Sequence, residues 1–111
     1  MAATPSVNIV IPQGSEFTET FLSTETNGDT TNLAGYIGEA KLKKHAGSAT
    51  SFTFSVSITA ASGEVSIGMT SGATALLEPG RYMYDVVLTS SSGAKSRLVE
   101  GMSLVTAGIT L

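Results

Sequence analysis

The chain has 111 residues, of which 41% are hydrophobic and 14% are charged, and it contains 12 glycines. That length suits one compact domain, and that composition favours short β-strands joined by turns over a helical bundle or a disordered chain. The net charge of -3 disfavours nucleic acid and anionic membranes as partners, and the lack of cysteine excludes disulfides, zinc–thiolate sites and thiol nucleophiles.

The N-terminal stretch "MAATPSVNIVIPQ" predicts a first strand in "VNIVIP". Its apolar run is too short for a signal peptide or a membrane span, so we expect the protein to be cytoplasmic when it is made. Two roles are open for this stretch. It is either the first strand of the chain's own sheet, or an extended arm over residues 1–15 that contacts another subunit through Val7, Ile9 and Ile11.

Alternation of apolar and polar residues predicts six further strands, because every second side chain of a strand lies on the same face. In chain order these are "SEFTETFLS", "YIGEAKLKK", "SFTFSVSIT", "EVSIGMT", "RYMYDVVLT" and "SRLVEGMSLV". The clearest is "SFTFSVSIT", with Phe52, Phe54, Val56 and Ile58 on one face. We expect it to form a hairpin with "EVSIGMT".

The segment "TSGATALL" breaks the alternation. It predicts one short helical turn near residues 71–77, which Pro79 and Gly80 would end. Seven strands at this spacing, with no long amphipathic helix, predict an antiparallel β-sandwich or barrel that spans residues 1–111 as a single domain.

The lysines of "KLKKHAGS" form the densest positive cluster in the sequence. Lys41 and Lys43 would project from the same face of their strand, which is typical of a solvated face or of an edge strand protected against aggregation. The alternative is an ion pair with an acidic surface on a partner. His45 is the only histidine and has no companion motif, so we expect neither a catalytic nor a metal-binding role for it.

Sequence signatures of catalysis are missing from the chain. It contains no P-loop, no GxGxxG, no GxSxG and no HExxH motif. Its serines alternate with apolar residues, as they do on the solvated face of a strand. We therefore expect no enzyme, no catalytic residue, no cofactor, no metal and no small-molecule substrate.

The stretch "EPGRYMYDVVL" places two of the three tyrosines next to a proline. Pro79 and Gly80 predict a turn, and alternation then puts Tyr82 and Tyr84 on one face of the following strand. In immunoglobulin-like sandwiches, a tyrosine at such a corner bonds its hydroxyl to backbone a few residues upstream. We expect Tyr82 to bond to the backbone of residues 74–77, and we interpret the segment as a structural corner rather than a ligand site.

The segments "LAGYIGEAKLKKHAGS" and "LEPGRYMYDVVLTSSSGAKSRLVEGMSLV" resemble bacteriophage and prophage proteins that include the N-terminal domain of baseplate upper proteins. The resemblance covers roughly residues 16–110. Longer members continue into a helical or receptor-binding region, whereas this sequence ends at "AGITL". We therefore expect this chain to be a free-standing copy of the adaptor. The matching positions are expected to be structural; they are Gly35, Tyr36, Gly80, Tyr82, Tyr84, Asp85, Gly93, Arg97, Glu100 and Gly101.

This resemblance implies an immunoglobulin-like β-sandwich that serves as a virion building block in the tail, baseplate or neck. Its partners would be other virion structural proteins, and we expect it to be a homo-oligomer or to be present in many copies in the particle. Two alternatives are a capsid decoration protein that stabilises the head and a carbohydrate-binding module. The second is disfavoured because the chain has no tryptophan and only three tyrosines.

Overall fold

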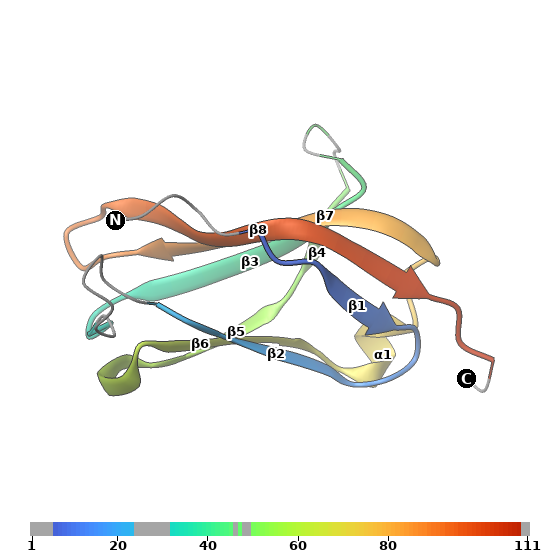
Figure 1. The fold of residues 1–111 in the computed structure, drawn as a ribbon, viewed down its shortest axis with the longest axis horizontal. Helices are drawn as coiled ribbons and strands as arrows, with labels where there is room; N and C mark the ends of the chain where they lie inside the picture. Colours follow the sequence, from blue (N-terminus) through green and yellow to red (C-terminus); the bar gives the residue numbers. More distant parts are fainter. Residues whose placement is uncertain (1–5, 24–31, 46, 48–49, 110–111) are drawn as a thin grey trace.

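The computed structural model describes residues 6–23, 32–45, 47 and 50–109, and they form two β-sheets packed as a sandwich (Figure 1). One sheet has five strands in the order β1-β8-β7-β3-β4, and the other has three in the order β2-β6-β5. The strands are β1 (Ile9–Pro12), β2 (Phe17–Leu22), β3 (Ile37–Lys43), β4 (Phe52–Thr53), β5 (Ser55–Thr59), β6 (Glu64–Met69), β7 (Gly80–Thr89) and β8 (Lys95–Thr106). The expected all-β sandwich is confirmed.

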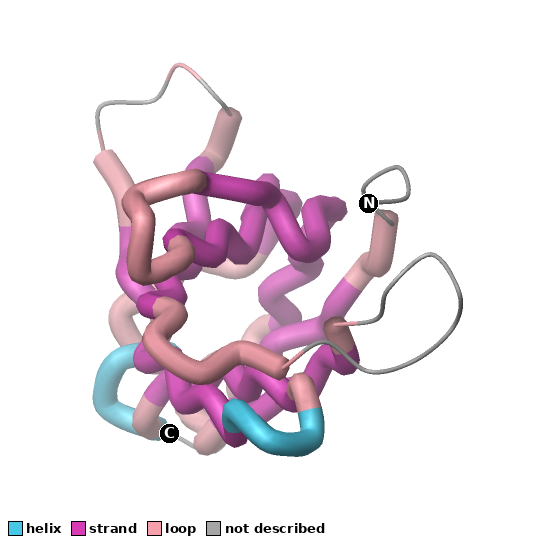
Figure 2. The backbone as a smooth tube through the Cα atoms, turned by 90° about the vertical axis from the view of Figure 1, so that its left-hand side faces the viewer, coloured by secondary structure: helices cyan, strands magenta, loops and turns pink. Residues whose placement is uncertain are grey.

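Figure 2 shows the two sheets facing each other in a view along the long axis. The buried hydrophobic residues of the core pack between them. Alternation explains most of it, because β7 buries every second side chain from Tyr82 to Leu88. Strand β8 departs from alternation at a β-bulge. Val86 lies opposite Val99 and Val87 lies opposite Arg97, so Leu98 has no partner across the pair. Both Leu98 and Val99 are buried in the core.

The segment "SFTFSVSIT" forms two strands rather than the single one expected. The chain changes sheet at Phe54: β4 pairs with β3 in the larger sheet, and β5 pairs with β6 in the smaller. The Phe54 amide bonds to the Ala40 carbonyl at 3.0 Å, which anchors the crossing to β3. The structure therefore has eight strands. The predicted hairpin with "EVSIGMT" is confirmed for its second half, β5, across a 3₁₀ turn at Ala60–Ser62 (η1).

The helical turn is confirmed and is shorter than predicted, as α1 (Ser71–Thr74). Thr70 caps it by accepting a hydrogen bond from the Ala73 amide at 3.2 Å. Thr74 is fully buried, and its hydroxyl accepts from the Gly14 amide at 3.1 Å and lies 2.8 Å from the Ser15 carbonyl. The turn therefore fixes the connection between β1 and β2.

The N-terminal strand corrects two expectations. First, β1 pairs parallel to β8, so the larger sheet is not purely antiparallel. Second, Ile9 and Ile11 are 4% and 0% exposed within the chain's own core. They cannot be contacts to another subunit, because their side chains already fill the space between the sheets. Val7 is 36% exposed, and residues 1–5 of the alternative N-terminal arm lie outside the described part of the chain.

Candidate functional site

The corner before β7 is built as a structural element. The Tyr82 hydroxyl donates a hydrogen bond to the Glu78 carbonyl at 2.8 Å, one residue beyond the range expected from the sequence. Its ring is buried, meets Phe52 edge-on at 6.3 Å, and carries the Lys44 ammonium 4.4 Å from its centre. Pro79 lies in the bend before the strand, and Gly80 begins the strand with φ of +141°. Tyr82 is 2% exposed, so these contacts cover almost its whole side chain.

Tyr84 holds the N-terminal segment against the larger sheet. Its hydroxyl donates to the Val7 carbonyl, and the Val7 amide bonds to the Glu100 carbonyl at 2.9 Å. Gly101 lies opposite Tyr84, and a methyl group on it would overlap the Val7 backbone. Burial, and secondarily the nearby Glu19 carboxylate, raises the pKa of Tyr84 from 10.0 to about 12. Tyr84 is therefore a buried neutral hydrogen-bond donor.

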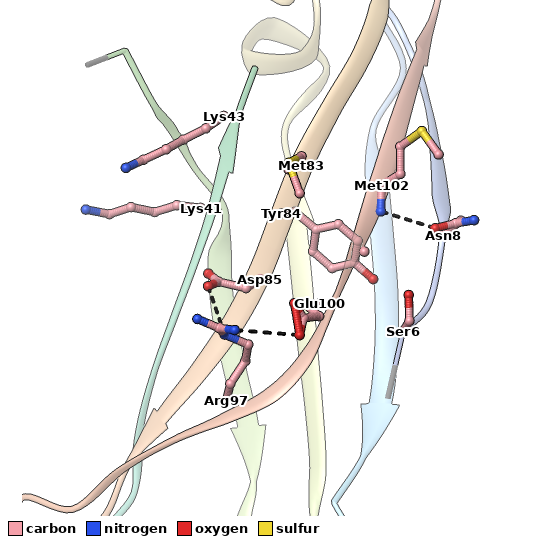
Figure 3. A pocket seen from close by; sticks show the side chains of 11 residues that line it. Ser6, Asn8, Lys41, Lys43, Met83, Tyr84, Asp85, Arg97, Glu100 and Met102 are labelled. Carbon is pink, nitrogen blue, oxygen red and sulfur yellow. Dashed lines mark hydrogen bonds and ion pairs between the residues drawn. The ribbon is translucent and has the colours of Figure 1, made fainter. Parts of the chain in front are cut away.

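The face of the five-stranded sheet that points away from the core carries the most varied side chains. Strand register places them in rows across β3, β7 and β8. One row joins Lys43, Met83 and Met102, and the next joins Lys41, Asp85 and Glu100. These residues line an open groove of ≈ 650 Å³, which Figure 3 shows from close by; its other lining residues are Ser6, Asn8, Tyr84, Arg97 and Gly101.

A small ion network crosses this groove. Arg97 Nε lies 3.3 Å from Asp85 Oδ2, and Arg97 Nη1 lies 3.6 Å from Glu100 Oε1 (Figure 3). The three side chains are between 37% and 50% exposed, so we expect each pair to contribute less than about 1 kcal/mol to stability. The strand register brings them together, and sequence reasoning did not predict that they would meet.

Exposed apolar side chains continue the groove toward β1. Met83 and Met102 lie opposite each other and are 52% and 39% exposed. Leu104, at 42%, lies opposite Val10, at 56%. We call these four residues the apolar strip. Alternation alone could have identified Met83 as an apolar residue on the outer face of its strand. Predicting the whole strip would have required the register of three strands.

Basic residues gather on the same sheet. Every lysine and arginine of the chain lies in β3, β7 or β8, or directly after β3, and none lies in the three-stranded sheet. Lys41 and Lys43 are therefore part of a solvated face. They are not on a free edge, because β3 lies between β7 and β4 and Lys41 pairs with Thr53. The edge-strand interpretation of these lysines is corrected.

In the described part of the chain, no group of three or more histidine, cysteine, aspartate or glutamate side chains lies close enough to hold a metal ion. His45 is exposed after β3. The arrangement on the five-stranded sheet suits contact with another macromolecule: an apolar strip, cations at one side and a charged pair network at the centre.

Comparisons with known proteins extend the description of the fold. No family model matches the chain, and no curated protein matches it. Among solved structures, the fold is similar to that of a point mutant of the SrpA adhesin from Streptococcus sanguinis, with a TM-score of 0.51 and 18% sequence identity. The match covers 96% of this chain and 60% of the adhesin chain, so the chain spans less than two thirds of that protein. In the described residues, no helix is long and apolar enough to cross a membrane.

Proposed function

We propose that the chain is a bacteriophage virion structural protein, a non-enzymatic building block that docks to other virion proteins in the tail, baseplate or neck. The sequence resemblance to phage adaptor domains over residues 16–110 supports this role. The observation that carries it is the outer face of the five-stranded sheet. There, three positions of the family pattern, Asp85, Arg97 and Glu100, form one ion network beside the exposed apolar strip.

The face is suited to docking because it combines two kinds of contact. The apolar strip would lose its water on contact, which supplies the main driving force for association. Lys43 lies opposite Met83 and Arg81 lies opposite Leu104, and Lys41 lies in the next row. These cations would pair with acidic groups on the partner, which favours one orientation over others. In a particle, many copies would multiply a modest affinity for each single contact.

A capsid decoration role for the same protein would use the same face and differ only in the place that it occupies. A carbohydrate-binding role draws less support. Such modules stack sugars on exposed aromatic rings, and the residues lining the groove include one aromatic, Tyr84, which is 4% exposed. The similarity to the SrpA adhesin, at 18% sequence identity, supports the fold and no particular function.

Mass spectrometry of purified phage particles tests the proposed role. The chain should be present at a fixed ratio to the major capsid protein in particles that have been washed and banded. Labelling its copies with a bound antibody fragment in electron micrographs would separate tail, baseplate and neck from a decorated head. Its absence from the particles would overturn both virion roles.

A second experiment tests the face itself. The double variant Met83→Glu, Met102→Lys should fold normally, since both side chains are exposed and the new charges lie opposite each other with opposite sign, next to Lys43. It should no longer be incorporated into particles in a complementation assay. Ser57→Lys is the matched control, because Ser57 is an exposed strand residue on the three-stranded sheet. Equal incorporation of the double variant and the control would exclude this face as the docking surface.

A further inference from the structure

The two sheets of the sandwich have four edge strands, and three of them are unsuited to pairing with another chain. Strand β1 has four residues and ends in Pro12, which has no backbone N–H to donate. Strand β4 has two residues. Strand β5 follows β4 after a single residue, Phe54, and packs against β3. At this contact Val56 lies over Gly38, and a methyl group added to Gly38 would come within 2.6 Å of the Val56 side chain. The chain itself closes that side of the sandwich.

The fourth edge, β2, is different. It is a regular strand of six residues, "FTETFL", that contains no proline and no lysine, and in the described part of the chain it pairs only with β6. Thr18, Thr20 and Leu22 are exposed on its outer face, while Phe17 and Phe21 face the core. Its register with β6 runs without a bulge from Phe17 to Leu22. Natural proteins usually protect an edge of this length, because its free N–H and C=O groups can pair with another strand.

We propose that β2 pairs antiparallel with β2 of a second copy of this chain, about a two-fold axis at Thr20. The pairing would join two three-stranded sheets into one of six strands. It concerns a different surface from the groove on the five-stranded sheet, and it stands whether or not the protein is found in a virion.

The register follows from the residues of β2. Keeping both cores on the same side of the joined sheet requires that core-facing residues lie opposite core-facing residues. An axis at Phe21 would pair only residues 20–22, and an axis at Glu19 would place two half-buried carboxylates opposite each other, which is unfavourable. An axis at Thr20 pairs residues 18–22 of both copies and places Glu19 opposite Phe21.

Glu19 is the one residue of β2 that could prevent another strand from pairing with this edge, since it is a charged residue on the core-facing side. In the proposed dimer it selects the register instead of preventing the pairing. The outer face offers no electrostatic obstacle near the axis. Thr20 bonds to Ser66 at 2.9 Å, and Ser66 lies opposite Ser57, so the row through the axis carries hydroxyl groups only.

Single-cysteine variants test this geometry directly, because the natural chain has no cysteine. Directly opposed residues of an antiparallel pair have Cα atoms about 4.5–5.5 Å apart, within the range that a disulfide spans. Under mild oxidation, Thr20→Cys should give a covalent dimer. Ser57→Cys is the matched control: it lies in the same row across β6 on the opposite edge of the sheet, and it should remain largely monomeric.

Sedimentation equilibrium provides a second, non-covalent measurement. The wild-type chain should show a mass that rises with concentration toward twice the monomer's 11.3 kDa. Thr20→Lys should weaken the association by up to about fivefold, because the axis would then place two lysines directly opposite each other. Ser57→Lys should associate like wild type. A chain that stays monomeric up to about 1 mM, or cross-linking of Thr20→Cys no faster than that of Ser57→Cys, would overturn the proposal.

Discussion

The Tyr84 hydroxyl donates a hydrogen bond to the Val7 carbonyl, 77 positions earlier in the chain. It does so beside Gly101, where the lack of a side chain lets the Val7 backbone lie against β8. One tyrosine and one glycine therefore fix how the N-terminal segment enters β1. The contact gives both residues a physical role in the fold.

Replacing Tyr84 with phenylalanine removes this hydrogen bond and leaves the ring in place. We expect a loss of about 1–2 kcal/mol in the free energy of unfolding, because the partly buried Val7 carbonyl then lacks its donor. Urea unfolding measures the loss, and hydrogen exchange should show faster opening of β1. Tyr36→Phe is the control, since no hydrogen bond of the Tyr36 hydroxyl is found among the described residues. An unchanged Tyr84→Phe variant would show that the contact does not stabilise the fold.

Alkaline pH should destabilise the protein through the same hydroxyl. The pKa of Tyr84 is about 12 in the folded chain and near 10.0 when unfolded, so between these values the folded state holds a proton that the unfolded state has lost. Stability is therefore complete below pH 10 and falls as the pH rises toward 12, by up to about 1.4 kcal/mol per pH unit. Other groups titrate there too, so the quantity to measure is the difference in slope between wild type and Tyr84→Phe. Parallel slopes would contradict the assignment.

Gly101→Ala should displace the N-terminal segment, because the added methyl overlaps the Val7 backbone. We expect a loss of about 1–3 kcal/mol in the free energy of unfolding, the usual range for overpacking in a filled interior. Gly72→Ala in α1 is the matched control. An added methyl there meets nothing within 4 Å, and alanine is favoured over glycine in a helix, so its stability should be equal or slightly higher. Equal effects of the two changes would mean that the segment moves freely.

Ser103→Ala should not destabilise the protein. Ser103 is 0% exposed in β8, and its hydroxyl has no hydrogen-bond partner among the described residues. Replacing an unpartnered buried hydroxyl by hydrogen removes a group that is costly to bury, so we expect a change between zero and about 1 kcal/mol of stabilisation. Thermal unfolding of the two proteins side by side is sufficient. A clear loss of stability would show that the hydroxyl has a partner, such as a buried water.

Local alternation was a good guide to where the strands lie and which side chains they bury. It placed Tyr82 and Tyr84 in the core, and the break in alternation before Pro79 predicted the turn of helix after β6. It could not show that the chain changes sheet at Phe54, because the alternation continues through that residue without interruption. The parallel pairing of β1 was hidden for a related reason. A sequence of four alternating residues carries no information about the direction of its neighbour.

The candidate site was harder to predict than the fold. Lys41 and Lys43 could be assigned to one face of a strand, but their neighbours Met83 and Asp85 come from a strand some 40 positions away. Whether such residues meet depends on the register of β3, β7 and β8, which is a property of the folded sheet. The sequence could therefore name single residues on the outer face of the five-stranded sheet and could not show which of them meet.

The extra residue Leu98 in β8 also affects which side chains the outer face of the five-stranded sheet displays. Because one extra residue lies between Arg97 and Val99, Arg97 and Glu100 both point outward although they are separated by an odd number of positions. Deleting Leu98 would remove the bulge and restore strict alternation, so Arg97 and Glu100 would still point outward with Val99 between them. The core would lose one buried leucine. The bulge therefore lets β8 bury two adjacent apolar residues without turning either charged neighbour inward.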